Sequence, residues 1–268
     1  MKVEFFDVEH GSCALITCDD NTRLMIDCGH NASTGWRPGD YLKSIGVDHL
    51  DMLAVTNYDE DHVSGLPNLR EKVSIGWLWR NSSVTGPGIR ELKRGNTPGK
   101  GIEALIDMIA AYNGTSTNYP AFRGLERKAF CHSLTEFQDE NNLSLVVHAK
   151  CAGMGFMFTG DMEIPGWKKL IERSDVQSAL ADTKILLASH HGRDDGCCDG
   201  IFDHCAPTLI VISDDYHKYS TQETTDWYAS KVASPILHKG INRRVLTTRS
   251  DGNVTFYQND GKWHFTTG

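Results

Sequence analysis

The segment 56–62 constrains this chain most, because it places several metal-binding side chains directly after an apolar run at 52–55. The run is typical of a buried strand, and the residues after it read Thr-Asn-Tyr-Asp-Glu-Asp-His. A strand that ends in a short loop fixes the backbone, so alternate loop residues direct their side chains to one point. We therefore expect a hydrolytic metal centre that includes Asn57, Asp59, Asp61 and His62.

Four further motifs follow the pattern of strands that end in polar or glycine-containing turns. Residues 5–14 read FFDVEHGSCA and residues 24–29 read LMIDCG. Residues 156–161 read FMFTGD, and residues 186–192 read LLASHHG. An acidic loop alone is usually a solvated surface feature, whereas five such motifs in this order predict one composite site.

The segment 56–62 resembles the H-x-[HD]-x-D-H signature of the metallo-beta-lactamase superfamily, with Asn57 in place of the first histidine. The other four motifs resemble, in order, the opening strand, the D-x-G turn, the Gly-Asp turn and the late histidine motif of that superfamily. The opening motif is most similar to the branch that includes the hydrolase domain of the competence DNA-uptake channel. The resemblance extends from residue 3 to about residue 213. It implies an α/β fold of the αββα sandwich type.

The resemblance also implies two divalent ions, about 3.5–4 Å apart, that share the hydroxide attacking the substrate. Asn57 and Asp59 correspond to ligands of the first ion, and Asp61 and His62 to ligands of the second. Asp161 corresponds to the bridging ligand. Of the adjacent histidines, His191 stands where the final ligand is expected, and His190 is then left to orient or contact substrate. Asp27 resembles the aspartate that supports a ligand from behind.

The departures from the family pattern affect the choice of metal. Asn141 stands near the place where many members carry a third histidine for the first ion. Asn57, Asp59 and Asn141 offer oxygen atoms, which suit Mn²⁺ or Mg²⁺ better than Zn²⁺. The cofactors expected are therefore two divalent ions, manganese or zinc, or else magnesium, with a single tightly bound ion as the alternative. Thr221 stands where the family carries a further histidine. The nearby His217 is either a substitute acid for that histidine or a solvated loop residue.

The length, composition and charge of the chain indicate how many domains it forms, where it is located and what it binds. A chain of 268 residues with 40% hydrophobic residues and no linker is expected to form one domain over residues 1–268. Its beginning lacks the pattern of a signal peptide, and irregularly spaced cysteines favour reduced thiols, so we expect a cytoplasmic protein without a membrane partner. The net charge of −8 argues against general adhesion to nucleic acid. A basic segment at 80–100 is the exception, predicted as a mobile loop whose substrate-contacting candidates are Arg90, Lys93 and Arg94.

Periodicity predicts the elements that carry these motifs. Strands are expected at 3–7, 13–18, 23–27, 51–55, 184–189 and 208–212, with a hairpin formed by 143–149 and 154–159. Helices are expected at 38–45, 102–111, 165–173 and 221–233. Two terminal hairpins are expected around turns at 250–253 and 259–262. The remaining histidines outside the motifs, and His10 within the first one, are interpreted as ordinary surface or packed residues.

Fold alone does not select a reaction in this superfamily. The branch resemblance and the oxygen-rich first site favour a metal-dependent phosphodiesterase or nuclease acting on a nucleic acid or nucleotide. A small-molecule ester, lactone or amide hydrolase is the alternative, and it predicts a compact apolar pocket. A third hypothesis is a degenerate binding or regulatory module. The retention of Asp59, Asp61, His62, Asp161 and His191 together weighs against it.

Overall fold

Two β-sheets stack face to face in the computed structural model, which describes residues 1–112, 114, 119–216 and 223–268. The first sheet contains seven strands and is antiparallel except where β3 pairs with β4 and β4 with β5. Its order is β15 (Lys262–Thr267), β14 (Val254–Asn259), β1 (Lys2–Phe5), β2 (Ala14–Thr17), β3 (Arg23–Ile26), β4 (His49–Ala54) and β5 (Ser74–Trp79).

The second sheet contains six strands, of which β8, β9, β10 and β13 run parallel to their neighbours in that group. Its order is β13 (Val245–Thr247), β10 (Leu209–Ile212), β9 (Thr183–Leu187), β8 (Met154–Phe158), β7 (Val146–Cys151) and β6 (Leu125–Phe130). A separate ribbon pairs β11 (Ile236–His238) with β12 (Ile241–Arg243).

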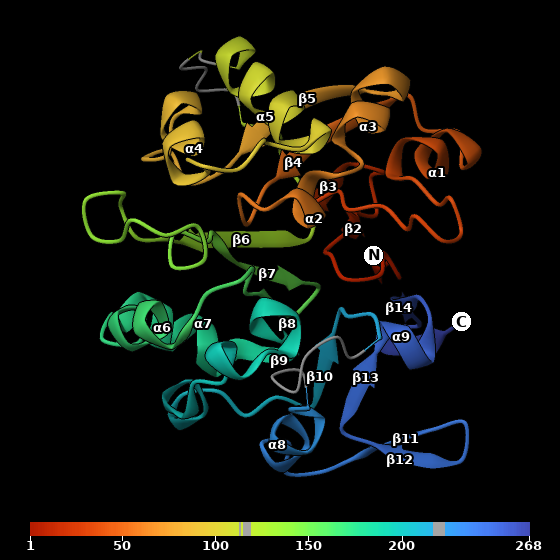
Figure 1. The fold of residues 1–268 in the computed structure, drawn as a ribbon. Coiled ribbons are helices and arrows are strands. Elements are labelled where there is room, and N and C mark those ends of the chain that lie inside the picture. Colours follow the sequence, from red (N-terminus) through yellow and green to blue (C-terminus); the bar gives the residue numbers. More distant parts are fainter. Residues whose placement is uncertain (113, 115–118, 217–222) are drawn as a thin grey trace.

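Helices cover the outer face of each sheet, so the layers are helix, sheet, sheet and helix (Figure 1). On the first sheet lie α1 (Pro38–Ser44), α2 (Glu60–Val63), α3 (Leu66–Lys72), α4 (Gly86–Leu92) and α5 (Lys100–Ala111). On the second lie α6 (Ile164–Leu170), α7 (Ser174–Asp182) and α8 (Thr225–Ser230). The short α9 (Thr248–Asp251) follows β13, and 3₁₀ turns η1 (Ser189–Gly192), η2 (Asp194–Gly196) and η3 (Asp199–Asp203) follow β9. The αββα sandwich expected from the sequence is confirmed.

The period-two pattern of the strands explains this layering. In β3, Leu24 and Ile26 point into the core between the sheets, whereas Met25 packs against the helices outside. Successive residues of a strand face opposite sides, so one short strand contributes to two cores. Each of these three side chains is almost fully buried, and its burial stabilises the fold by roughly 1.5–3 kcal/mol.

Most predicted elements are present, with three corrections. The basic segment 80–100 is not a loop throughout, because α4 begins after Thr85, whose hydroxyl accepts a hydrogen bond from the Gly88 amide. Pro87 suits the first turn of a helix, and Ile89 is buried beneath it. Residues 250–253 do not form a hairpin turn, because β13 and β14 belong to different sheets. The helix predicted at 221–233 is shorter, since α8 ends at Ser230; residues 221 and 222 lie outside the described residues.

The sequence analysis did not predict β5, β6, α2, α3 and α7, nor the ribbon of β11 and β12. The predicted pairing of β7 with β8 and the closing hairpin of β14 and β15 are confirmed. All eight cysteines fall among the described residues and are free thiols. Among the described residues, no helix has both the length and the apolar character needed to cross a bilayer.

Candidate metal centre

Loops that follow parallel strands bring the predicted site residues together. Asp27 follows β3, the segment 57–62 follows β4, Asp161 follows β8, and His191 follows β9. The carboxyl ends of neighbouring parallel strands share one edge of a sheet, so residues distant in sequence converge there. Gly29 allows the close approach, because a Cβ at this position would lie 2.5 Å from the carbonyl oxygen of Asp61. This steric requirement accounts for the glycine of the D-x-G motif.

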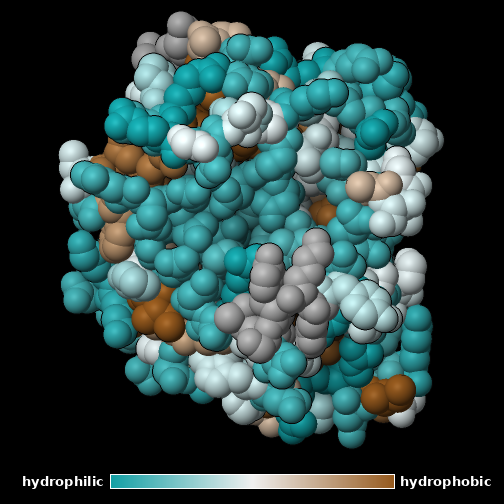
Figure 2. All heavy atoms as spheres, viewed as in Figure 1, coloured by the Kyte–Doolittle hydropathy of each residue, from teal (hydrophilic) through white to brown (hydrophobic). Residues whose placement is uncertain are grey.

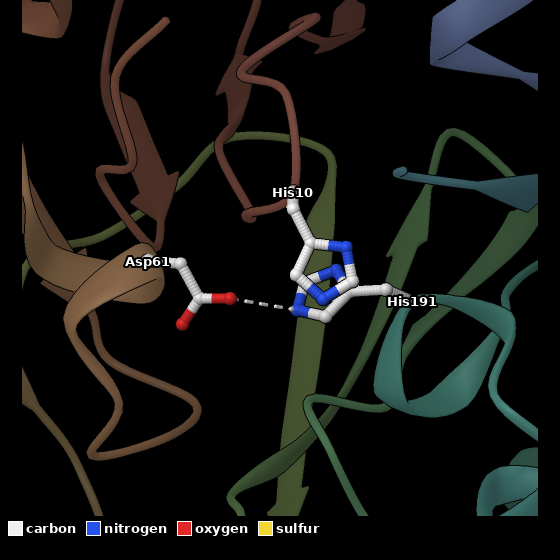
Figure 3. Close-up of side chains that lie close together, drawn as sticks. All are labelled: His10, Asp61 and His191. Atoms are coloured by element: carbon white, nitrogen blue, oxygen red, sulfur yellow. Dashed lines mark ion pairs between the residues drawn. The ribbon is translucent and has the colours of Figure 1, made fainter. Parts of the chain in front are cut away.

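Two imidazoles and two carboxylates form the centre of the site. The Nε2 atom of His62 lies 3.0 Å from Oδ1 of Asp161. The Nε2 atom of His191 lies 3.4 Å from Oδ2 of Asp61 and 3.5 Å from Oδ1 of Asp161. His62, Asp161 and His191 are buried, whereas Asp61 is partly exposed. Figure 3 shows His191 between Asp61 and His10.

Both imidazoles are oriented by oxygen acceptors that bind Nδ1, the ring nitrogen that faces away from the carboxylates of the centre. Nδ1 of His62 donates to Oδ2 of Asp27 at 2.8 Å, and Asp27 also accepts from the backbone amide of Thr56 at 2.7 Å. Nδ1 of His191 donates to the carbonyl oxygen of Ser213 at 2.9 Å. These bonds fix which nitrogen carries the hydrogen and direct each Nε2 toward the carboxylates. Asp27 therefore occupies the supporting position that the sequence predicted for it.

The fit to a divalent cation rests on the Nε2 atom of His191. That atom is buried and has no hydrogen-bond partner, although two carboxylate oxygens lie within 3.5 Å. A buried polar atom without a partner is rare and costly in folded proteins. Two imidazole nitrogens and two carboxylates suit Zn²⁺, Mn²⁺ or Fe²⁺. Asp61, His62, Asp161 and His191 thus fit a metal ion.

The pKa values of the cluster show that its carboxylates stabilise positive charge on the imidazoles. Burial raises the pKa of Asp161, but the charges of His62 and His191 more than offset this and hold it below the ordinary value. The pKa of Asp61 is likewise lowered, because His191 and His62 outweigh the effect of burial. Burial alone would lower the pKa of His62, yet Asp161 and Asp27 raise it well above the ordinary value. A cation bound here would compete with these protons, so ion binding should release them.

His10 belongs to the site, which the sequence interpretation missed. It lies in the loop between β1 and β2, its ring centroid is 4.6 Å from that of His191, and it groups with Asp61 and His191. Burial, followed by the charge of His191, lowers its pKa to about 4, so the ring is neutral near pH 7. Its position inside the first motif was the available signal. The sequence interpretation, which treated His10 as an ordinary surface or packed residue, did not anticipate its position beside the cluster.

The two adjacent histidines face different partners. Both adopt left-handed backbone conformations, with φ of 50° at His190 and 52° at His191. Nδ1 of His190 lies 2.8 Å from Asp195 and 3.8 Å from Glu163, and these three residues form a separate group. His191 alone of the pair reaches the cluster around Asp161. The geometry therefore agrees with the expectation that His191, and not His190, is the ligand.

The residues predicted for the first ion are engaged in other contacts. The ammonium group of Lys93 binds the carboxylate of Asp59 and lies 2.7 Å from that of Glu140. The Nδ2 atom of Asn57 donates to Oγ of Ser144 at 3.1 Å. Asn57 also donates to Oδ1 of Asn141, and its own oxygen accepts from the Asp59 amide. This part of the site consists of a lysine, two carboxylates and their amide neighbours.

The other predicted residues lie outside this cluster. Arg90 forms a paired contact with Glu103 at 2.7 and 2.8 Å, and Arg94 pairs with Glu91 at 2.6 Å, all on the exposed surface. Of the predicted basic contacts, only Lys93 points toward the site. His217 lies outside the described residues.

Two hollows adjoin the cluster. A void of about 10 Å³ is bounded by side chains that include His62, Asp161 and His191, and it has the size of one water molecule. A larger pocket of about 270 Å³ opens beside His10 and Asp61. Its described lining has one apolar residue, Val8, and is otherwise polar or charged.

With this geometry established, the comparisons with known proteins identify the class. The family model described as the metallo-beta-lactamase superfamily matches residues 6–192, and the chain belongs to this family. A ribonuclease Z of Lachnoclostridium phytofermentans is 35% identical over 81 residues, which is 30% of this chain. The matched part spans 25% of that relative's length.

Two solved structures are similar to this chain at low identity, and the first of them shows the same fold. The diiron beta-hydroxylase CmlA from Streptomyces venezuelae has a TM-score of 0.55 and 12% identity, covering 96% of this chain and 54% of that one. A diphosphatase from the PhnP family has a TM-score of 0.45 and 11% identity, covering 96% of this chain and 98% of that one. The family is one of metal-dependent hydrolases in the main, and its fold implies divalent metal ions here. The similarity to the competence branch stays a prediction.

Proposed function

We propose that this chain is a metal-dependent phosphodiesterase, with nucleic acids or nucleotides as substrates. The observation that carries the proposal is the buried Nε2 atom of His191, which makes no hydrogen bond and lies beside Asp61, Asp161 and the oriented His62. A divalent ion bound there would activate water and stabilise the negative charge that develops in hydrolysis. A role limited to regulation would not require such a cluster.

The protein's own residues supply orientation and proton control. Asp27 and the Ser213 carbonyl hold His62 and His191, so the ligand nitrogens need no rearrangement. His10, neutral near pH 7 and within the pocket of about 270 Å³, is placed to accept or relay a proton at its imidazole. Asp61 borders both the cluster and that pocket, so it links the ion to the substrate space. The roles proposed from sequence for His190 and His217 stay untested proposals.

The described residues of the pocket do not form the compact apolar lining expected of the alternative substrates, and its four carboxylates would need a bound cation before an anionic phosphodiester could enter. A small ester, lactone or amide hydrolase was expected to carry a compact apolar pocket, and Val8 is the sole apolar residue among the described lining. The face drawn in Figure 2 is also largely hydrophilic between the two helical layers. The partial similarity to a ribonuclease Z supports the same direction. Manganese and zinc are the proposed ions, with magnesium as a third candidate.

The test is a substrate and metal screen on protein purified without chelator. Metal content is measured first, and the protein is then assayed with Mn²⁺, Zn²⁺ and Mg²⁺ separately. Substrates are linear DNA, RNA, cyclic dinucleotides, a nitrophenyl phosphodiester, a nitrophenyl ester and a lactone. Asp161→Asn is the inactive comparison. Turnover of a phosphodiester by the wild type alone supports the proposal, whereas turnover confined to the ester or lactone overturns it.

A further inference from the structure

Lys93 has an unusual position for a residue of a basic, glycine-rich segment. It follows α4 directly, and its side chain is only 11% exposed. The ammonium group binds two carboxylates, that of Asp59 and that of Glu140. Its basic neighbours Arg90 and Arg94 are exposed and pair with surface carboxylates instead. Lys93 is therefore part of the interior of the site and not of the surface charge.

One carboxylate that binds this ammonium group, that of Asp59, belongs to the residues that the resemblance assigns to the first ion of the family's pair. Asp59 lies two residues before Asp61, in the segment whose first half the resemblance assigns to the first ion. The amide groups of Asn57 and Asn141 bond to each other, and Asn57 donates to Ser144. Nδ2 of Asn141 also donates to Glu163 at 2.8 Å. Asn57 and Asn141 are thus engaged with neighbouring side chains, and Asp59 with Lys93.

A divalent ion and an ammonium group compete directly in such a place. Both need the carboxylate oxygens of Asp59 and Glu140, and like charges at contact distance repel strongly in a partly buried site. The ammonium group of Lys93 contacts both carboxylates, so it occupies the side of each that an ion would need. The ammonium group offsets one of the two negative charges, so less charge remains to attract an ion.

We propose that the Lys93 ammonium group replaces the first ion of the family's pair, so that this chain binds a single divalent ion at Asp61, His62, Asp161 and His191. The inference rests on the metal centre of the proposed function and changes its number of ions from the two expected from sequence. It also assigns Asp59 and Glu140 to a charge network and not to metal binding. The fixed positive charge of Lys93 then stands beside the centre without exchange with solvent.

The first experiment counts ions. Wild type, Lys93→Met and Arg94→Met are loaded with Mn²⁺ or Zn²⁺, freed of excess metal and measured by plasma mass spectrometry and by calorimetric titration. Lys93→Met removes the ammonium group while keeping the length of the side chain, and Arg94→Met removes a neighbouring charge that does not reach Asp59. We expect one ion per chain in wild type and Arg94→Met, and a second Mn²⁺ in Lys93→Met. Two ions in the wild type, or only one in folded Lys93→Met, would overturn the proposal.

A second variant keeps the test decisive where Lys93→Met fails to fold. Asp59→Asn weakens the contact with Lys93 and keeps the shape of the side chain. If Asp59 serves Lys93, the variant binds the same number of ions as the wild type, with unchanged affinity, and loses thermal stability. If Asp59 is a metal ligand, bound metal falls at least tenfold in affinity and the proposal is wrong. Neither readout uses substrate, so a failure of the phosphodiesterase assignment is seen separately in the activity screen.

Discussion

Replacement of Asp27 by asparagine tests whether the site is organised to leave Nε2 of His62 available for a metal. Asp27 is fully buried and accepts from the Thr56 amide at 2.7 Å, from the Thr56 hydroxyl and from Nδ1 of His62 at 2.8 Å. In Asp27→Asn, the amide oxygen keeps the bond to the Thr56 amide. The new NH₂ group faces Nδ1 of His62 and can only donate a hydrogen bond to it. Nδ1 must then carry no hydrogen, so the hydrogen of the neutral ring lies on Nε2. That nitrogen donates to Asp161 and is no longer a ligand.

The expected magnitudes separate metal binding from stability. Ion-free protein loses a charged hydrogen bond, worth about 1.5–3 kcal/mol, and gains a neutral one, worth about 0.5–1.5 kcal/mol. The free energy of unfolding should therefore fall by about 1–2 kcal/mol. Metal affinity should fall by about 10–100-fold, or about 1.4–2.7 kcal/mol, because a ligand Nε2 requires a hydrogen on Nδ1, and that hydrogen would face the new NH₂ group instead of a carboxylate.

The assay is a competitive metal titration with a chromophoric chelator, together with urea unfolding of chelator-treated protein. Asp51→Asn is the matched control, since Oδ2 of Asp51 accepts from the Arg23 amide at 2.8 Å on the same sheet, away from the site. The control should change stability by a similar or smaller amount and leave metal affinity intact. Unchanged metal affinity in Asp27→Asn would refute the assignment of His62 as a ligand through Nε2.

Three other changes probe the centre, the surface and the pH dependence. Asp61→Ala and Asp161→Ala should each abolish hydrolysis and reduce bound metal while circular dichroism stays unchanged; full activity in metal-depleted Asp161→Ala would contradict the assignment. In a double variant, Arg90→Ala with Arg94→Ala should raise KM for a nucleic acid and flatten its salt dependence by roughly one unit of slope per lost phosphate contact, with a small phosphodiester unaffected. An unchanged slope would indicate a small substrate. Burial raises the pKa of Asp214 to about 6, so its native form holds a proton that the unfolded chain has lost. The stability that this gives is present at pH 4 and lost as the pH rises through 6, so the stability difference between wild type and Asp214→Asn should shrink over this range in urea unfolding; a constant difference would contradict it.

Local patterns predict the strands and the loops that carry the ligands, whereas the sandwich and the meeting of the ligands were implied by the family resemblance. Alternation in strands such as 24–26 indicates which side chains face the two cores, and the loops after those strands carry the ligands. The loops after β3 and β4 of one sheet meet the loops after β8 and β9 of the other, which brings Asp27, His62, Asp161 and His191 together. The resemblance supplied the roles expected for them. No local pattern in the chain would have placed these residues in contact without that resemblance.

The missed features depend on contacts between distant segments. The pairing of Lys93 with Asp59 and Glu140 joins residues 34 and 47 positions apart, and its charge alone predicted an exposed loop. His10 meets His191 only because β1 lies in one sheet and β9 in the other. Polar residues carry no periodic signal for such contacts, since each is decided by the packing of whole layers. A charged residue near a motif is therefore assigned to surface or interior by the fold, and not by its neighbours in the sequence.

The backbone at the site adds a physical reason for its rigidity. Asp27, His190 and His191 all have φ between 50° and 57°, a left-handed conformation that costs roughly 1–3 kcal/mol for each such residue. The strain is opposed by specific bonds: Asp27 accepts three hydrogen bonds, and the His191 ring is fixed by the Ser213 carbonyl. Because a strained residue persists only where its surroundings determine it, these loops are held in place before an ion binds. The affinity for the ion is then not reduced by the cost of ordering its ligands, and an open position beside Asp61 stays available for water and substrate.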